Sequence, residues 1–448
     1  MRSLIVALLI AAIIPLASAE DVIKIGVIGP MDTKYGTAMA NAVKLAADEI
    51  NEQGGILGKK IEVVVADTKL DQNTATSEFR RLVVDEGCKV IIGGFSSGVA
   101  LSMMDTMADL AREGHKVIWL GDASSPRLTD KVAKDYEHYK YYFRPLVLNA
   151  STFPLDMVEM LDFLRSQGLN IKKVAIIRDN ALWTDDVMKV FKPLLEEHGY
   201  EIVMDEKAEK GQTDFSTFLI KAQEKADVIV PILAHVRGDS LVKQWAEMKI
   251  KIPIAGHDLS AIDPDFWNAT DGKCFGEIYT ADGGGVPSPI NDKMKHFLEA
   301  YKAKYGHLPE AYSAYGCYDA VYLYKAAVEM AAKAGESDPF DPDVLVKYLE
   351  KFNRSNPFEG VRGKIAFTKN HDSVWGDGFI RNWICQWQDG KQVVLYPEYM
   401  ATGKLVLPDW IKPKAEETPK TEKKGASGFE LIAGLLALAS AYAIGRKL

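Results

Sequence analysis

The chain has 448 residues, of which 47% are hydrophobic and 26% are charged, and its formal net charge is −8. This is the balance of a globular protein of about three domains, and it excludes collagen, a wholly disordered chain and a polytopic membrane protein. The acidic balance also argues against a nucleic-acid-binding protein, which would need a clustered basic face.

Residues 1–19 form the first predicted element, a secretory signal peptide. Arg2 supplies a positive start, an apolar stretch runs to Leu16, and Ala17-Ser18-Ala19 has the small-x-small form that signal peptidase accepts. The mature chain is therefore expected to begin at Glu20, outside the cytoplasm, where disulfides persist. The chain has too few cysteines for a disulfide scaffold, none in zinc-ligand spacing, and their three pairings stay open. They are Cys88, Cys274, Cys317 and Cys385.

Short apolar runs that alternate with helical segments make up the body. The first helical segment places Met39, Val43, Ala46 and Ile50 on one apolar face. Two series of such runs predict two α/β lobes, each a mostly parallel sheet covered by helices on both sides. The first series is 23–29, 61–66, 89–94 and 116–121; the second is 173–177, 201–204, 227–232 and 252–255.

The later part of the body is less regular. It predicts a strand near 275–280, helices near 289–305 and 311–334, and a hairpin of 383–387 with 392–396 around Asp389-Gly390. Long tails of this kind often return to an earlier lobe.

The carboxyl ends of the strands are where open α/β sheets bind ligands. At one of them, Gly94-Phe95-Ser96-Ser97-Gly98 has three interpretations. It matches an esterase elbow with Ser96 as nucleophile, for which Asp258 and His371 could formally complete a triad. It also suits an anion-binding turn at a helix start. The third interpretation is a simple helix cap by Ser97.

Other strand ends carry candidate binding residues. Asp258 could hold a ligand ammonium through a charge-assisted hydrogen bond, or only cap a helix. Tyr35 and Trp183 follow strands directly, where large aromatic side chains can form the wall of a pocket or cover the lobe edge. His235 and His257 are isolated histidines without metal-ligand spacing, so we expect no metal and no cofactor.

Two segments close the chain. Residues 411–428 are rich in Lys, Glu, Thr and Pro and predict a disordered linker. Residues 429–448 are apolar up to a terminal basic pair, which predicts a C-terminal membrane anchor of marginal length with a cytoplasmic end. The alternative is a helix docked on the body. The segment also resembles the C-terminal sorting signals of secreted archaeal proteins, with Ser427 in place of the usual proline.

From about Ile23 to Pro397 the chain resembles the periplasmic leucine/isoleucine/valine-binding proteins, the type I solute-binding components of ABC importers. The resemblance rests on the order and spacing of many segments. They include IKIGVIGP, YGTAMANAVKLAADEINEQGGILGKKIEVVVAD, VIIGGFSSG, FRP at 143–145, KKVAIIRDN, TDFSTFLIKAQEKADVIVP, FLEAYKAKYGHLPEAYSAYGCYDAVYL and QWQDGK.

The resemblance implies a two-lobed type I periplasmic-binding-protein fold, with three strands forming the hinge and the ligand enclosed between the lobes. Lobe one would take 20–143 and 280–352, and lobe two 144–279 and 353–410.

The resemblance also assigns the ligand contacts. Ser97 and Ser124 would hold the ligand carboxylate, Asp258 its ammonium, and Tyr35 and Trp183 would line the pocket. Asp122 falls where the family has a small residue, and it would repel a ligand carboxylate unless it points away.

The implied function is that of an extracytoplasmic solute-binding protein without catalysis, which closes on its ligand by a hinge motion. A branched-chain amino acid is the favoured ligand, and a different small polar or cationic solute is the alternative. The partners would be an ABC permease and its ATPase. The alternatives in function are a ligand-sensing domain of a membrane receptor and a secreted serine esterase that uses Ser96.

Overall fold

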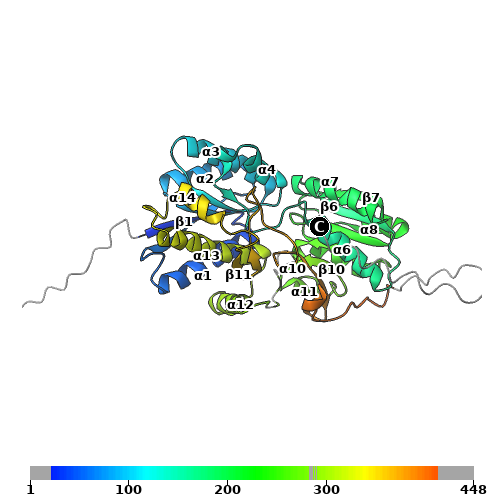
Figure 1. Ribbon diagram of the computed structural model, residues 1–448. Helices are drawn as coiled ribbons and strands as arrows, with labels where there is room; N and C mark the ends of the chain where they lie inside the picture. Colours follow the sequence, from blue (N-terminus) through cyan, green and yellow to red (C-terminus); the bar gives the residue numbers. More distant parts are fainter. Residues whose placement is uncertain (1–21, 282–285, 287, 289, 412–448) are drawn as a thin grey trace, which may run out of the picture. The chain divides into compact units, whose positions relative to one another are not determined.

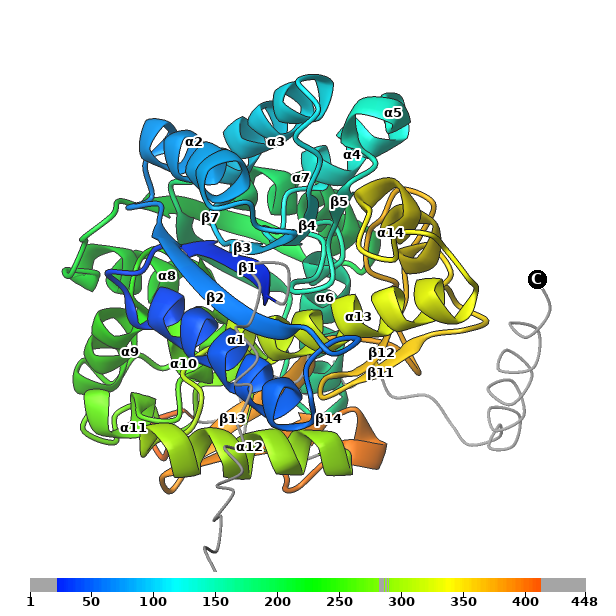
Figure 2. The same ribbon diagram turned by 90° about the vertical axis from the view of Figure 1, so that its left-hand side faces the viewer.

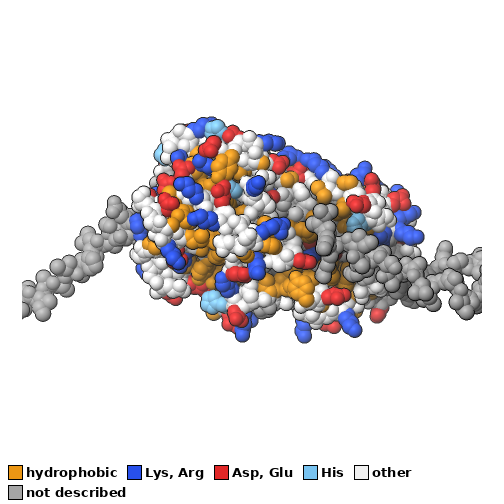
Figure 3. Space-filling view, in the orientation of Figure 1, with side chains coloured by type: hydrophobic (Ala, Val, Ile, Leu, Met, Phe, Trp, Pro, Cys, Tyr) orange, Lys and Arg blue, Asp and Glu red, His pale blue; other side chains and the backbone are white. Residues whose placement is uncertain are grey.

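The computed structural model describes residues 22–281, 286, 288 and 290–411. The predicted signal peptide and the predicted anchor at 429–448 lie outside the described residues, as does the predicted linker beyond Ile411. In the part that is described, no helix is long and apolar enough to cross a membrane. On the face drawn in Figure 3, basic and acidic side chains are interspersed.

The first sheet is entirely parallel and has the strand order β2-β1-β3-β4-β5. Its strands are β1 (Val22–Gly29), β2 (Lys60–Asp67), β3 (Val90–Gly94), β4 (Ile118–Asp122) and β5 (Tyr142–Phe143). The helices between them are α1 (Lys34–Glu52), α2 (Gln72–Arg80), α3 (Ser97–Arg112), α4 (Pro126–Lys134) and α5 (Tyr136–Tyr139), and Arg81–Asp85 adds a π-helical turn after α2.

The second sheet has the order β14-β13-β10-β9-β8-β6-β7. Its first five strands in the chain run parallel: β6 (Lys173–Asp179), β7 (Glu201–Ala208), β8 (Val228–Leu233), β9 (Ala255–Asp258) and β10 (Ile278–Ala281). The late hairpin of β13 (Trp383–Gln388) and β14 (Lys391–Tyr396) joins β10 in antiparallel fashion. The helices between the strands of the second sheet are α6 (Phe153–Ser166), α7 (Leu182–Glu197), α8 (Ser216–Lys225), α9 (Gly238–Glu247), α10 (Leu259–Ile262) and α11 (Phe266–Ala269).

A third stretch of chain returns to the first sheet. It contains α12 (Asp292–Tyr305), α13 (Tyr312–Lys333), α14 (Pro342–Leu349) and the small antiparallel pair of β11 (Phe358–Gly360) and β12 (Gly363–Ile365). A 3₁₀ turn, Glu398–Met400, follows β14. Helix α13 packs along α1. Figure 2 shows α1 and α13 on one face of the first sheet and α2 and α3 on the other.

The predicted fold class is confirmed, because two mostly parallel sheets are each flanked by helices (Figure 1). The strands of the first sheet all precede residue 144, and those of the second lie in 173–281 and 383–396. The residue limits of the two lobes stay a prediction.

The structure differs from the sequence-based expectations for one strand and for the cysteines. The strand predicted at 252–255 forms instead at 255–258, since Pro253 has no N–H to give to a ladder; Asp258 therefore ends a strand. The four cysteines are all buried and free, so none of the three pairings occurs.

Candidate functional site

A cavity of about 30 Å³ lies where the carboxyl ends of strands from both sheets meet. Both sheets contribute lining residues, as do the crossover after β5 and the start of α13. The lining consists of Phe95, Ser97, Ser124, Val147, Phe153, Trp183, Ala234, His235, His257 and Tyr312. Such a volume holds about one or two water molecules, so a larger solute enters only when the lobes or their side chains move apart.

The turn after β3 points the start of α3 toward this cavity. Gly93 has φ +115°, and a Cβ there would lie 2.2 Å from the carbonyl oxygen of Ile28, so only glycine fits. Ser96 is the N-cap of α3, but its side chain makes no hydrogen bond to the helix. The Ser97 hydroxyl oxygen instead accepts the backbone N–H of Ser125 at 3.2 Å, so Ser97 does not act as a cap of its own helix. The N-terminus of this 16-residue helix therefore favours an anion.

The turn after β4 brings a second helix start to the same place. Ser125 caps α4, and Ser124 beside it lines the cavity. The buried Arg144 donates to the carbonyl oxygens of Ala123 and Ser125 at 3.1 and 2.7 Å and so holds this turn from behind. Asp122 is buried at the end of β4 and is not a lining residue, so its carboxylate need not repel an anion.

A buried carboxylate, Asp179, organises the opposite wall. It accepts hydrogen bonds from Trp183 Nε1 at 3.1 Å and from the backbone N–H groups of Ala234, His235 and Val236 at 2.8–3.0 Å. These contacts fix both the tryptophan and the loop after β8. In the sequence, the only signal for this role is an acid at the end of a strand.

Aromatic rings form most of the remaining wall. His257 stacks on Phe153 with ring centroids 5.0 Å apart and meets the edge of Trp183 at 5.9 Å. Its Nδ1 lies 3.0 Å from the Thr280 hydroxyl, and burial lowers the pKa of His257 to about 4. The imidazole is therefore neutral at pH 7. Tyr35 stacks on the lining residue Phe95 at 5.8 Å and lies behind it.

Asp258 is placed differently from the other predicted contacts. It caps α10 by accepting the N–H of Ser260 at 2.8 Å, and its other oxygen packs against Gly238. Glu277 is the second fully buried carboxyl beside it, and burial raises the pKa of both groups, that of Asp258 to about 7. Asp258 is not a lining residue of the cavity, and its contact with a ligand ammonium stays a prediction.

The formal partners of Ser96 in an esterase triad are engaged elsewhere. His371 has Nδ1 2.9 Å from the carbonyl oxygen of Tyr142 and Nε2 3.0 Å from Glu350, while Asp258 caps α10. Within the described residues, no group of three or more His, Cys, Asp or Glu could hold a metal ion.

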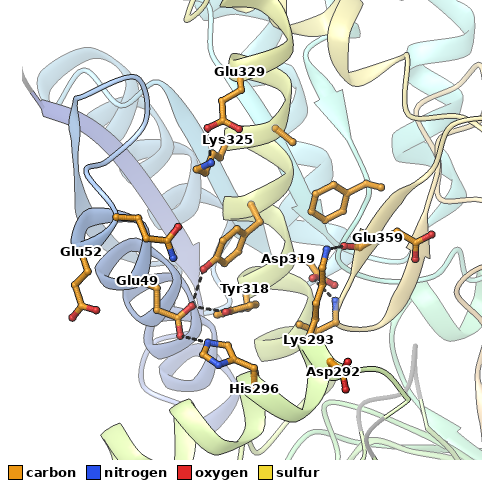
Figure 4. A pocket seen from close by; sticks show the side chains of 15 residues that line it. Glu49, Glu52, Asp292, Lys293, His296, Tyr318, Asp319, Lys325, Glu329 and Glu359 are labelled. Atoms are coloured by element: carbon orange, nitrogen blue, oxygen red, sulfur yellow. Dashed lines mark hydrogen bonds and ion pairs between the residues drawn. The ribbon is translucent and has the colours of Figure 1, made fainter. Parts of the chain in front are cut away.

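A larger groove of about 640 Å³ lies between α1, α12, α13 and β11 (Figure 4). There Glu49 accepts hydrogen bonds from the hydroxyls of Tyr318 and Tyr322 and contacts His296. The start of α12 lines the groove, but most of the groove's other carboxylates are exposed, and carboxylates disfavour an anion there. The smaller cavity is therefore the better candidate site.

Comparisons with known proteins place the chain in a family. The family model described as "Periplasmic binding protein" matches residues 22–391. The Leu/Ile/Val-binding protein BraC3 of Rhizobium johnstonii is 27% identical over 331 residues, which cover 73% of this chain and 84% of that protein.

Two solved structures are also similar. The branched-chain amino acid transporter substrate binding protein LivJ of Streptococcus pneumoniae, in complex with isoleucine, has a TM-score of 0.67 and 28% identity, and the match covers 84% of this chain and 100% of that one. A solute binding protein of an ABC transporter from R. palustris, in complex with benzoate, has a TM-score of 0.66 and 19% identity, covering 87% and 99%.

Proposed function

Because the chain belongs to the periplasmic binding protein family, we propose that it is the extracytoplasmic solute-binding component of an ABC importer. It takes a small carboxylate-bearing solute between its lobes and delivers it to a permease and its ATPase. The observation that carries this proposal is the convergence of two helix starts, with the hydroxyls of Ser97 and Ser124, on a cavity between two sheets. The protein binds its solute without converting it.

Branched-chain amino acids are the first candidate ligands. The relatives are named for leucine, isoleucine and valine, and the S. pneumoniae structure holds isoleucine. An amino acid brings an ammonium group, and the contact that we assign to it is Asp258, which would have to turn away from Gly238.

Aromatic carboxylates are the second candidate class, and a specific observation favours them. The lining residues of the cavity that are described include four large aromatic side chains and no carboxylate. A benzoate-like ligand needs an anion site and flat apolar walls but no counter-charge, and the R. palustris structure holds benzoate.

Binding requires hinge closure with contacts from both lobes, because a ligand shifts the equilibrium only by binding the closed form better. Ser97 and Ser124 supply the contacts from the first sheet. Trp183 supplies the apolar contact from the second.

A ligand panel tests the proposal. Isoleucine, leucine, valine, benzoate and 4-hydroxybenzoate are added to the purified body in thermal unfolding experiments. A cognate ligand at 100 times its Kd should raise the free energy of unfolding by about 2.7 kcal/mol. Mass spectrometry of the small molecule released from denatured protein identifies a ligand outside the panel. A protein that releases no solute and responds to no small carboxylate would count against the proposal, and turnover of small esters that is lost in Ser96→Ala would favour the esterase.

We further propose that the segment 429–448 holds the protein at the outer face of the cytoplasmic membrane. Full-length protein should remain with membranes in high salt, because an apolar anchor is not screened by ions as a charged surface contact is. A chain that ends before Lys412 should be soluble and should bind ligand with unchanged affinity. Full-length protein that is freely soluble without detergent would contradict the anchor.

A further inference from the structure

The carboxylate of Asp186 on α7 connects the two lobes beside the cavity. It is 2% exposed. The hydroxyl of Ser125, in the first lobe, donates to its Oδ2 at 2.7 Å, and Arg127 of α4 donates to its Oδ1 at 3.0 Å. Lys189, one turn further along α7, also donates to Oδ1 at 2.7 Å.

The partners of Asp186 are the same groups that form the site. Ser125 gives its backbone N–H to the Ser97 hydroxyl and caps α4, next to Ser124. Trp183 lies one turn before Asp186 on the same helix. The carboxylate of Asp186 thus connects the turns that carry Ser97 and Ser124 in the first lobe to the helix that carries Trp183 in the second.

A second contact between the lobes accompanies it. Lys34, the first residue of α1, pairs with Asp263, which follows α10. The protein therefore has direct lobe-to-lobe bonds in addition to any that a ligand would supply.

We propose that Asp186 is a closure latch, a positioning residue that sets how readily the lobes stay closed over the ligand. The inference rests on the proposed function. Opening the lobes separates Asp186 from Ser125 and Arg127 and returns the carboxylate to water, whereas closure restores two charge-assisted hydrogen bonds. Burial alone would raise the pKa of Asp186, but Lys189, Ser125 and Arg127 lower it, so the latch is charged at neutral pH.

Loss of the latch should affect ligand affinity differently from loss of a residue that contacts the ligand. Apparent affinity falls in proportion to the population of the binding-competent form. Asp186 is not a lining residue of the cavity, so its loss should weaken every ligand by the same factor.

Asp186→Ala tests this by titration of two or more ligands that the wild type binds. The affinity should fall by about 10- to 100-fold for each, as expected for loss of hydrogen bonds to a charged group, and mainly through faster dissociation. Asp185→Ala is the matched control, because Asp185 pairs with Arg178 and Lys207 inside its own lobe. Its affinity should stay within about twofold of wild type.

A second measurement separates the latch from the proposed function. Spin labels at the exposed positions Lys134→Cys and Lys192→Cys report the distance between α4 and α7 without ligand. Asp186→Ala should shift the distribution toward longer distances. If the wild type binds no carboxylate, the proposed function fails, and the spin-label result still decides on the latch. Unchanged distances and affinities, or a loss that differs between ligands, would overturn the latch.

Discussion

Replacing Arg144 by methionine should lower the free energy of unfolding by about 3–5 kcal/mol, the cost of breaking a buried ion pair by removing one partner. Arg144 is fully buried, and its Nε and one Nη bond the two oxygens of Asp372 at 2.8 and 2.7 Å. The same guanidinium donates to Thr129 and to the carbonyls of Ala123 and Ser125. The variant removes the cationic partner of Asp372, which keeps only the neutral donors Asn149 and Thr129. It also removes a donor from two carbonyl oxygens, and the turn that carries Ser124 loses this support.

Urea denaturation of the chain that ends before Lys412 measures this loss. The matched control is Arg80→Met, since Arg80 forms a bidentate pair with Glu113 in which both side chains are about half exposed. That change should cost at most about 1 kcal/mol. Adding Asp372→Asn to Arg144→Met should recover part of the stability, because the orphaned charge disappears. A double variant whose loss equals the sum of the two single losses would show that the pair is not coupled.

Replacing Glu277 by glutamine should stabilise the protein at pH 8, because a neutral amide avoids the cost of burying a second carboxylate beside Asp258. Asp258 and Glu277 are both fully buried, contact each other, and have no cationic partner among the described residues. Burial raises the pKa of both, so the folded state binds more protons than the unfolded state. Stability is therefore fully present below the unfolded pKa of about 4 and declines as the pH rises through about 7.

Thermal unfolding between pH 5 and pH 8 checks the direction of this pH dependence of stability. The glutamine variant should show a smaller loss of stability over this range than the wild type and should match it most closely at pH 5. Glu299→Gln, an exposed carboxyl on α12, serves as the control and should follow the wild-type curve. A Glu277→Gln variant that is less stable than the wild type at pH 8 would mean that the carboxyl has a partner that needs its charge.

Local patterns were sufficient to predict the fold class. The apolar runs of the body became strands of two sheets, and the hairpin around Asp389-Gly390 formed as expected, because hydrophobic periodicity and turn chemistry are local properties. The apolar face of the first helical segment, from Met39 to Ile50, is buried. The displacement of one strand to Ala255–Asp258 followed from Pro253, a residue whose effect on a ladder was visible in the sequence.

The site was predictable only where it lies at a strand end. Ser97, Ser124 and Trp183 line the cavity, and each follows a strand. Val147, Phe153 and Tyr312 come from crossovers and from a distant helix start, and no spacing in the sequence links them to the site. Their approach depends on how the lobes are joined.

The directions in which the buried carboxyl side chains point could also not be predicted from the sequence. Asp179 and Asp258 end strands of the second sheet and Asp186 lies on the helix after Asp179, yet the three have different environments. Asp179 holds a loop, Asp186 reaches the other lobe, and Asp258 turns toward Gly238. Only the tertiary packing decides which direction each side chain takes.

Calorimetric titration of one cognate carboxylate against a variant from each lobe tests the central claim most directly. Ser97→Ala should weaken binding by about 10- to 100-fold, because one hydrogen bond to a charged group is lost while the backbone donors remain. Ser102→Ala, further along α3 and outside the cavity lining, should bind like the wild type. Trp183→Leu should also weaken binding, since it removes part of the aromatic wall on the second lobe. A ligand that binds all four proteins with equal affinity would show that it is not held between the lobes, and would contradict the account.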